Sequence, residues 1–190
     1  MISEVPLANP RTREALVELM FTEFKVPKLY LGNSAVLSLF ATGRTTGTVV
    51  DAGYGITHTV PVYEGYALPF ATKEVPICGR DITKFLHEML VKRHPQIFQD
   101  TTDFLDEAEK IKLEFGHVCQ DFDAEIKAAN DSNGKDDKDR KYKLPSGQII
   151  QIREERLKCS EVLFAPGINS NSKAEDGIHK YTYDSIIKCD

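Results

Sequence analysis

Residues 51–55, which read Asp-Ala-Gly-Tyr-Gly, have the residue types of a phosphate-binding turn. Glycine lets a backbone approach a phosphate without an intervening Cβ and tolerates positive φ, and successive N–H groups in such a turn form an anion-binding nest. Asp51, at the end of a buried-type strand, has the chemistry to hold a hydrated Mg²⁺ beside those phosphates. On these five residues alone, an ordinary tight hairpin is the competing interpretation.

Other ligand-binding motifs are not predicted. The segment is no Walker loop, because no Gly-Lys-Ser/Thr follows it, and no dinucleotide fingerprint, because a strand and not a helix comes next. The four cysteines are far apart and form no C-x-x-C pair, so neither a zinc site nor a disulfide framework is indicated. We expect reduced and mostly packed thiols.

Composition narrows the class of protein. The chain has 190 residues, enough for one large domain or two small ones with a real core. Its net charge of -5 disfavours an extended nucleic-acid surface. No apolar run approaches the roughly 20 residues that span a bilayer, and the first ten residues lack the features of a signal peptide. We therefore expect an intracellular protein that neither crosses a membrane nor binds nucleic acid directly.

The elements around the glycine segment are predicted from hydrophobic periodicity. Residues 48–51 and 56–62 are β-rich and predict two strands of a hairpin with the glycines at its tip. Upstream, helices are predicted over 13–24 and 35–40, separated by a short strand over 28–31. Asn33 and Ser34 are alternative N-caps for the second helix.

Downstream of the hairpin the pattern is mainly helical. Residues 63–76 are predicted to be extended, and long helices follow over 79–93 and 101–118, the latter capped by Thr101 or Thr102. Residues 128–143 are highly charged and predict a loop, which is either a solvated linker or a site that recruits a partner. A hairpin over 142–152 and short helices over 154–157 and 183–187 complete the chain.

Long ordered segments of this sequence resemble actin. They comprise Ala-Val-Leu-Ser-Leu-Phe-Ala-Thr-Gly-Arg-Thr-Thr-Gly at 35–47, the glycine segment at 51–55, Thr-His-Thr-Val-Pro-Val-Tyr-Glu-Gly-Tyr-Ala-Leu-Pro at 57–69 and Gly-Arg-Asp at 79–81. Weaker similarity, as at 144–148 and 185–190, extends across nearly the whole chain. The chain is thus identified as a divergent member of the actin and actin-related family.

The resemblance implies an α/β fold of the actin-like ATPase, or ribonuclease H-like, type. It covers part of that fold: a mixed sheet with a β-hairpin phosphate loop plus a mainly helical subdomain. Residues 1–45 would end the first lobe, 46–78 form the second-lobe sheet, 79–165 the helical insertion with its charged loop, and 166–190 the return to the second lobe. The first lobe's phosphate hairpin and the later adenosine segment are not among these residues. We therefore expect a fragment of a longer parent, without a complete ATP clamp of its own.

The resemblance also implies the site residues. The intact parent would bind ATP or ADP with Mg²⁺ or Ca²⁺, with Asp51 near the metal and the backbone of Gly53, Tyr54, Gly55 and Ile56 around the β- and γ-phosphates. His58 matches a histidine near the hydrolytic water, Gly79 lies on the ribose side and Lys112 near the adenine. Judged without the resemblance, a histidine beside a strand more often packs, and a helix lysine more often faces solvent.

Three departures from the family pattern affect the expected activity. Ser34 stands where actin has the glutamine that orients the attacking water, Tyr54 replaces an aspartate of the hairpin, and Leu113 replaces a glutamate that contacts the nucleoside. They put hydrolysis in question more than binding, because orienting water is a transition-state task.

Three functions follow as alternatives: a cytoskeletal ATPase that forms filaments, a non-catalytic actin-related subunit of a larger complex, or a partner-binding domain built from residue 79 onward. The expected partners are actin-like protomers or actin-binding proteins. The expected compartment is the cytoplasm and its cytoskeleton, with the nucleus as the alternative.

Overall fold

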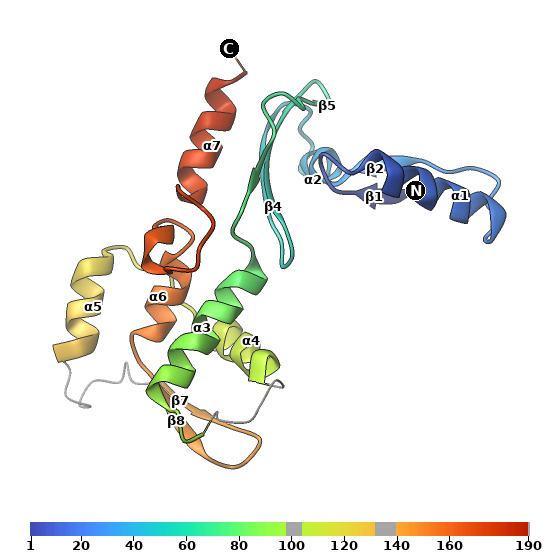
Figure 1. The fold of residues 1–190 in the computed structure, drawn as a ribbon. Helices are drawn as coiled ribbons and strands as arrows, with labels where there is room; N and C mark the ends of the chain where they lie inside the picture. The colour runs from blue at the N-terminus through green and yellow to red at the C-terminus, as the bar shows by residue number, and fades with distance from the viewer. Residues whose placement is uncertain (98–103, 132–139, 190) are drawn as a thin grey trace. The chain divides into compact units, whose positions relative to one another are not determined.

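A computed structural model describes residues 1–97, 104–131 and 140–189 (Figure 1). The chain divides into two compact units. The first comprises Met1–Val75 with His179–Asp190, and the second comprises Pro76–Ile178. Each unit has its own cluster of buried apolar side chains.

The first unit opens with a parallel strand pair, β1 (Ile2–Glu4) and β2 (Leu31–Asn33), joined by α1 (Pro10–Thr22). The predicted strand over 28–31 is wrong in position, since β2 begins only at Leu31. The reason is that its register is set by β1, a distant three-residue strand that has no periodicity to read.

Helix α2 (Ser34–Ala41) packs directly on the sheet of this unit. Its N-cap is Asn33, whose Oδ1 accepts a hydrogen bond of 3.0 Å from the amide of Ala35. Ser34 is therefore the first helical residue, and the alternative that Ser34 caps the helix is wrong. Ala35 and Leu39 bury against Val60 and Val62, which fixes α2 on one face of the strands.

The predicted glycine-tipped hairpin is confirmed as β3 (Gly47–Ala52) and β4 (Thr57–Tyr63), which pair antiparallel. Strand β4 is central, since β5 (Tyr66–Ala67) and β6 (Lys73–Val75) also pair with it. From its first residue to its sixth, β4 is buried on both faces, as expected for a β-branched run.

Helix α7 (Ile178–Ile187) attaches to this sheet through polar contacts. The buried Ser185 hydroxyl donates to the carbonyl of Ala71 at 2.7 Å, and Lys73 pairs with Asp184 at 3.1 Å. The Lys73 ammonium also lies 5.9 Å from the centre of the Tyr181 ring. The predicted helix over 183–187 is therefore too short, because α7 begins at Ile178 and its first turns carry mostly polar residues.

The second unit is built on α3 (Gly79–Arg93), α4 (Phe104–Phe115) and α6 (Glu155–Glu161), followed by the short 3₁₀ helix η1 (Pro166–Ile168). The predicted bounds of α3 are confirmed. Helix α4 ends at Phe115, short of the predicted 118, and Gly116 donates to the Lys112 carbonyl at 2.9 Å. The suggested caps Thr101 and Thr102 lie outside the described residues.

The predicted loop over 128–143 is wrong at both ends. Residues 128–131 form the last turn of α5 (Phe122–Asp131), which was not predicted because its apolar residues are few. Residues 140–143 form β7 (Arg140–Lys143), which pairs with β8 (Ile149–Ile152) as the predicted hairpin. Tyr142 anchors that hairpin by donating to Glu107 at 2.6 Å and by packing edge-on against Phe115.

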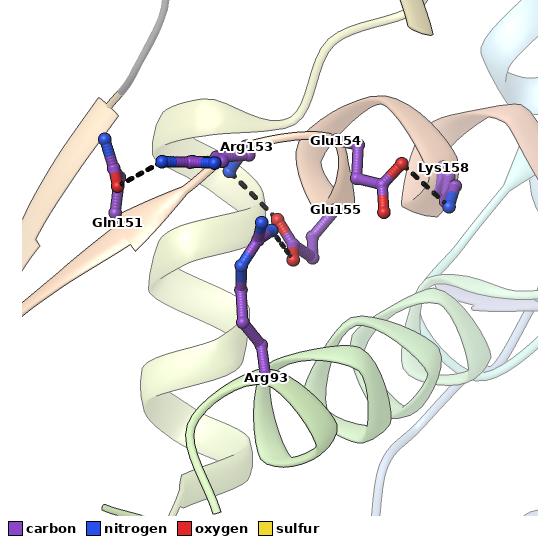
Figure 2. A network of polar contacts seen from close by, with 6 residues as sticks. All are labelled: Arg93, Gln151, Arg153, Glu154, Glu155 and Lys158. Carbon is purple, nitrogen blue, oxygen red and sulfur yellow. Dashed lines mark hydrogen bonds and ion pairs between the residues drawn. The ribbon is translucent and has the colours of Figure 1, made fainter. Parts of the chain in front are cut away.

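Figure 2 shows a polar network that joins three elements of the second unit. Glu155 is only 4% exposed, and its carboxylate forms an ion pair with Arg93 at the end of α3. The Arg153 amide donates to the other carboxylate oxygen at 2.9 Å, and the Arg153 side chain donates to Gln151 at 3.0 Å. Each oxygen of the buried Glu155 carboxylate thus has a donor, and the network ties α3, β8 and α6 together.

Over the described ranges, none of the helices is long and apolar enough to cross a membrane.

Candidate functional site

The tip of the β3–β4 hairpin is closed by its own backbone. The Gly53 amide donates to the Ile56 carbonyl at 3.0 Å. A Cβ built on Gly53 would lie 2.9 Å from that same oxygen, so a side chain there requires the backbone to shift. Neither Gly53 nor Gly55 has a positive φ. The tip therefore needs glycine for close backbone approach and not, as the sequence also suggested, for left-handed φ.

The outer part of the tip is open. A Cβ built on Gly55 would find no atom within 4 Å, and Tyr54 is 53% exposed. A ligand can therefore reach the backbone around Gly55. The predicted residues Gly53, Tyr54, Gly55 and Ile56 thus form one short turn with an accessible outer edge.

Three predicted residues meet beside the tip of the hairpin, although they come from α2, β3 and β4. The Ser34 hydroxyl donates to Oδ2 of the half-buried Asp51 at 3.5 Å. Asp51 is the register partner of His58 across the antiparallel pair. Because directly opposed residues of paired strands lie on the same face, the structure brings Asp51 and His58 together on one side of the sheet.

His58 is 2% exposed and lies between two acidic residues. Asp51 opposes it from β3, and Glu74 opposes it from β6. Burial lowers the pKa of His58 from its ordinary value, and the charges of Glu74 and Asp51 act against that shift. The imidazole is therefore neutral near pH 7, which leaves one ring nitrogen able to accept a proton. Glu74 was missed from the sequence because β6 has only three residues and no alternation.

The donor set of this site fits some metals and not others. In the described parts of the chain, no group of three or more His, Cys, Asp or Glu side chains is placed to hold a metal ion. A dedicated cage, as for zinc or a structural calcium, does not fit. One carboxylate beside an open backbone turn does fit Mg²⁺, which keeps several waters and binds through one or two carboxylates plus substrate phosphates.

The remaining two predicted residues meet in the second unit. The Lys112 ammonium donates to the Gly79 carbonyl at 3.1 Å and to the Thr83 hydroxyl at 2.8 Å, and that hydroxyl donates to Gly79 at 3.0 Å. Lys112 is thus not a solvated surface lysine. Thr83, buried one helical turn after Gly79, was missed because a threonine inside a helix carries no ligand signal.

The cysteines of the described residues are all free, with Cys78 and Cys159 buried. Burial raises the pKa of Cys159 to about 11, while the nearby Lys112 charge acts against that shift. Cys159 is therefore an inert packed thiol, in line with its expected role.

Comparison with known families decides the identity. The family model described as Actin matches residues 1–190, the whole length of the chain. The chain belongs to the actin family. This confirms the resemblance found in the sequence, and the mixed helices and strands of both units are consistent with an actin-like fold. The family also relates the chain to cytoskeletal proteins, and its members generally bind ATP or ADP with a divalent metal.

Proposed function

We propose that this actin-family protein binds ATP or ADP together with Mg²⁺ or Ca²⁺, and that the β3–β4 hairpin is the phosphate side of the site. One observation carries the proposal: an open glycine turn lies next to Asp51, the carboxylate at the end of β3, with Ser34 and His58 against it. Family membership supports it.

The proposed roles follow from the position of each group. The amides around Gly55 would donate to phosphate oxygens, because the outer edge of the turn is accessible there. The Asp51 carboxylate would accept hydrogen bonds from the water shell of the cation. A bound divalent cation supplies positive charge that offsets the charge of the phosphates. His58, neutral and buried, would orient a water molecule or accept its proton.

For the second unit by itself, Gly79 and Lys112 are proposed to take part in nucleoside binding, as the resemblance implies. Lys112 is held by two oxygen acceptors, so its position is fixed before a ligand arrives. A fixed cation beside the half-buried Gly79 at the start of α3 suits the polar edge of a ribose or a base. These roles rest on the resemblance and on the hydrogen bonds that hold Lys112.

A second candidate is a non-catalytic actin-related subunit of a larger complex, binding actin-like protomers or actin-binding proteins. Two observations favour it over a filament-forming ATPase. Leu113, at the position where actin has a glutamate, is 76% exposed and offers no polar contact to a nucleoside. Tyr54 leaves the hairpin tip without its second carboxylate. Leu113 removes a nucleoside contact and Tyr54 removes a carboxylate near the phosphates, whereas Ser34, in place of the water-orienting glutamine, is the departure that weakens transition-state stabilisation.

The test is equilibrium ATP binding by the full-length protein with Mg²⁺, followed by single-turnover phosphate release. Binding with turnover supports the ATPase, whereas binding without turnover supports the non-catalytic subunit. Ser34→Gln should then restore turnover if the missing water-orienting amide is the reason. No binding at millimolar ATP in Mg²⁺ and in Ca²⁺ would overturn the proposed function.

A further inference from the structure

A side-chain hydrogen bond between Ser34 and Asp51 links α2 to β3 near the tip of the hairpin. They are 17 residues apart in sequence, and the Ser34 hydroxyl lies 3.5 Å from Oδ2 of Asp51. We propose that Ser34 is a positioning residue for Asp51: its hydroxyl holds Oδ2, which leaves Oδ1 for the hydrated cation of a nucleotide. The inference rests on the proposed function, because only a cation gives the orientation of Asp51 a consequence.

The position of Ser34 is itself fixed by three neighbouring contacts. Asn33 caps the helix through the Ala35 amide at 3.0 Å, and Ala35 is completely buried against the sheet. One turn later, the Ser38 hydroxyl donates to the Ser34 carbonyl at 2.9 Å. Ser34 therefore has little freedom in its backbone, and only the rotation of its hydroxyl group and χ1 remains.

A donor beside Asp51 offsets negative charge in its surroundings. Its register partner His58 is deeply buried, and Glu74 on the far side of His58 carries a second negative charge. Among the described residues, Ser34 is the side chain that donates a hydrogen bond to the Asp51 carboxylate. At 3.5 Å this hydrogen bond is long, so it biases the broad χ2 rotation of Asp51 without fixing it, and Oδ1 is the oxygen left for a ligand.

The length of the side chain at position 34 matters for this role. Serine carries its hydroxyl on Cβ, and that short reach suffices for the 3.5 Å contact. A threonine keeps the hydroxyl at the same distance from the backbone, an alanine removes it, and a glutamine carries its amide two carbons further out. The serine at position 34 thus reaches the carboxylate, whereas a glutamine would reach further out.

The first arm of the test needs no ligand. It is a double-mutant cycle of Ser34→Ala and Asp51→Ala, read as the unfolding midpoint of the full protein. Ser34→Ala should lower the unfolding midpoint by about 2 °C in the otherwise unmutated protein and leave it unchanged in the Asp51→Ala background. Equal shifts in both backgrounds would overturn the inference, because they would show that Ser34 acts without Asp51.

The second arm compares Mn²⁺·ATP with ATP in EDTA, by calorimetry. Ser34→Ala should weaken Mn²⁺·ATP binding severalfold and leave metal-free ATP binding unchanged, while Ser34→Thr should keep the parent affinity for both. Equal losses with and without metal would overturn the inference in favour of a purely structural serine. If the parent protein binds no Mn²⁺·ATP, the proposed function and the cation role both fail, while the first arm still decides whether Ser34 positions Asp51.

Discussion

Two carboxylates, one in each unit, show how the same group serves structure or binding. Glu155 is buried, and its oxygens are engaged by Arg93 and by the Arg153 amide (Figure 2). Asp51 is half-buried and receives one long hydrogen bond from Ser34. The difference lies in the donors around each carboxylate: Glu155 has a donor on each oxygen, one of them from a cation, and stabilises the fold, whereas Asp51 beside an open turn has an oxygen left for a ligand.

The largest expected effect comes from removing Arg93, the cation that pairs with Glu155. Arg93→Met should lower the free energy of unfolding by about 3 kcal/mol, because it leaves a buried charge without its cation. Chemical denaturation followed by circular dichroism measures it. The matched control is Lys158→Met, whose ion pair with Glu154 is partly exposed and should cost about 0.5 kcal/mol or less. Equal losses of stability in the two variants would show that the burial of Glu155 does not set the strength of its ion pair.

The second prediction concerns Asp51, whose carboxylate receives a single long hydrogen bond. Asp51→Ala should weaken Mg²⁺·ATP binding about tenfold, as for a group that holds the water shell of a metal. Its free energy of unfolding should change by about 1 kcal/mol or less, since it loses only one long hydrogen bond. Isothermal calorimetry and denaturation on the same samples separate the two effects. A large loss of stability with unchanged ATP affinity would show that Asp51, like Glu155, serves the fold and not ligand binding.

The third prediction separates the two glycines of the tip. Gly53→Ala should lower the free energy of unfolding by about 1 kcal/mol, because its Cβ meets the Ile56 carbonyl. Gly55→Ala has open space and should be nearly neutral for folding, but its methyl group should weaken ATP binding by obstructing the phosphate approach. If both variants lose stability and keep their affinity, the tip is an ordinary hairpin.

The smallest expected effect comes from His58. Because burial lowers its pKa in the folded protein, the unfolded chain binds the proton more readily. Stability is therefore complete above the unfolded pKa of about 6.5 and falls as pH decreases below it. His58→Gln should show a shallower decline in the unfolding midpoint between pH 7 and 5. Identical pH profiles for the two proteins would contradict a neutral, buried His58.

The sequence predicted best those elements whose signal is local. The hairpin is marked by β-branched runs around glycines, and α3 by a long apolar stripe, so both were found nearly at their bounds. The β1–β2 pair and helix α5 were missed or misplaced because short elements depend on partners far along the chain. Tertiary context sets such elements more than propensity does.

The residues of the candidate site also divide into those with a local sequence signal and those placed by contacts between distant elements. Asp51 and the glycine turn were found from residue types alone, and the resemblance added His58, Gly79 and Lys112. The Ser34–Asp51 hydrogen bond, the position of Glu74 beyond His58 and the Thr83 contact to Lys112 depend on strand register and helix packing. Residue types do not specify those contacts, because each joins elements that are separate in sequence.

The central claim is that Asp51 and the glycine turn together hold a metal–nucleotide complex. The most direct measurement is a crystal structure of the full-length protein grown with ATP and Mn²⁺, with the manganese located by anomalous scattering. We expect the manganese peak within one water shell of Asp51, with phosphate oxygens against the backbone of residues 53–56. A nucleotide bound with its manganese away from Asp51 would contradict the account.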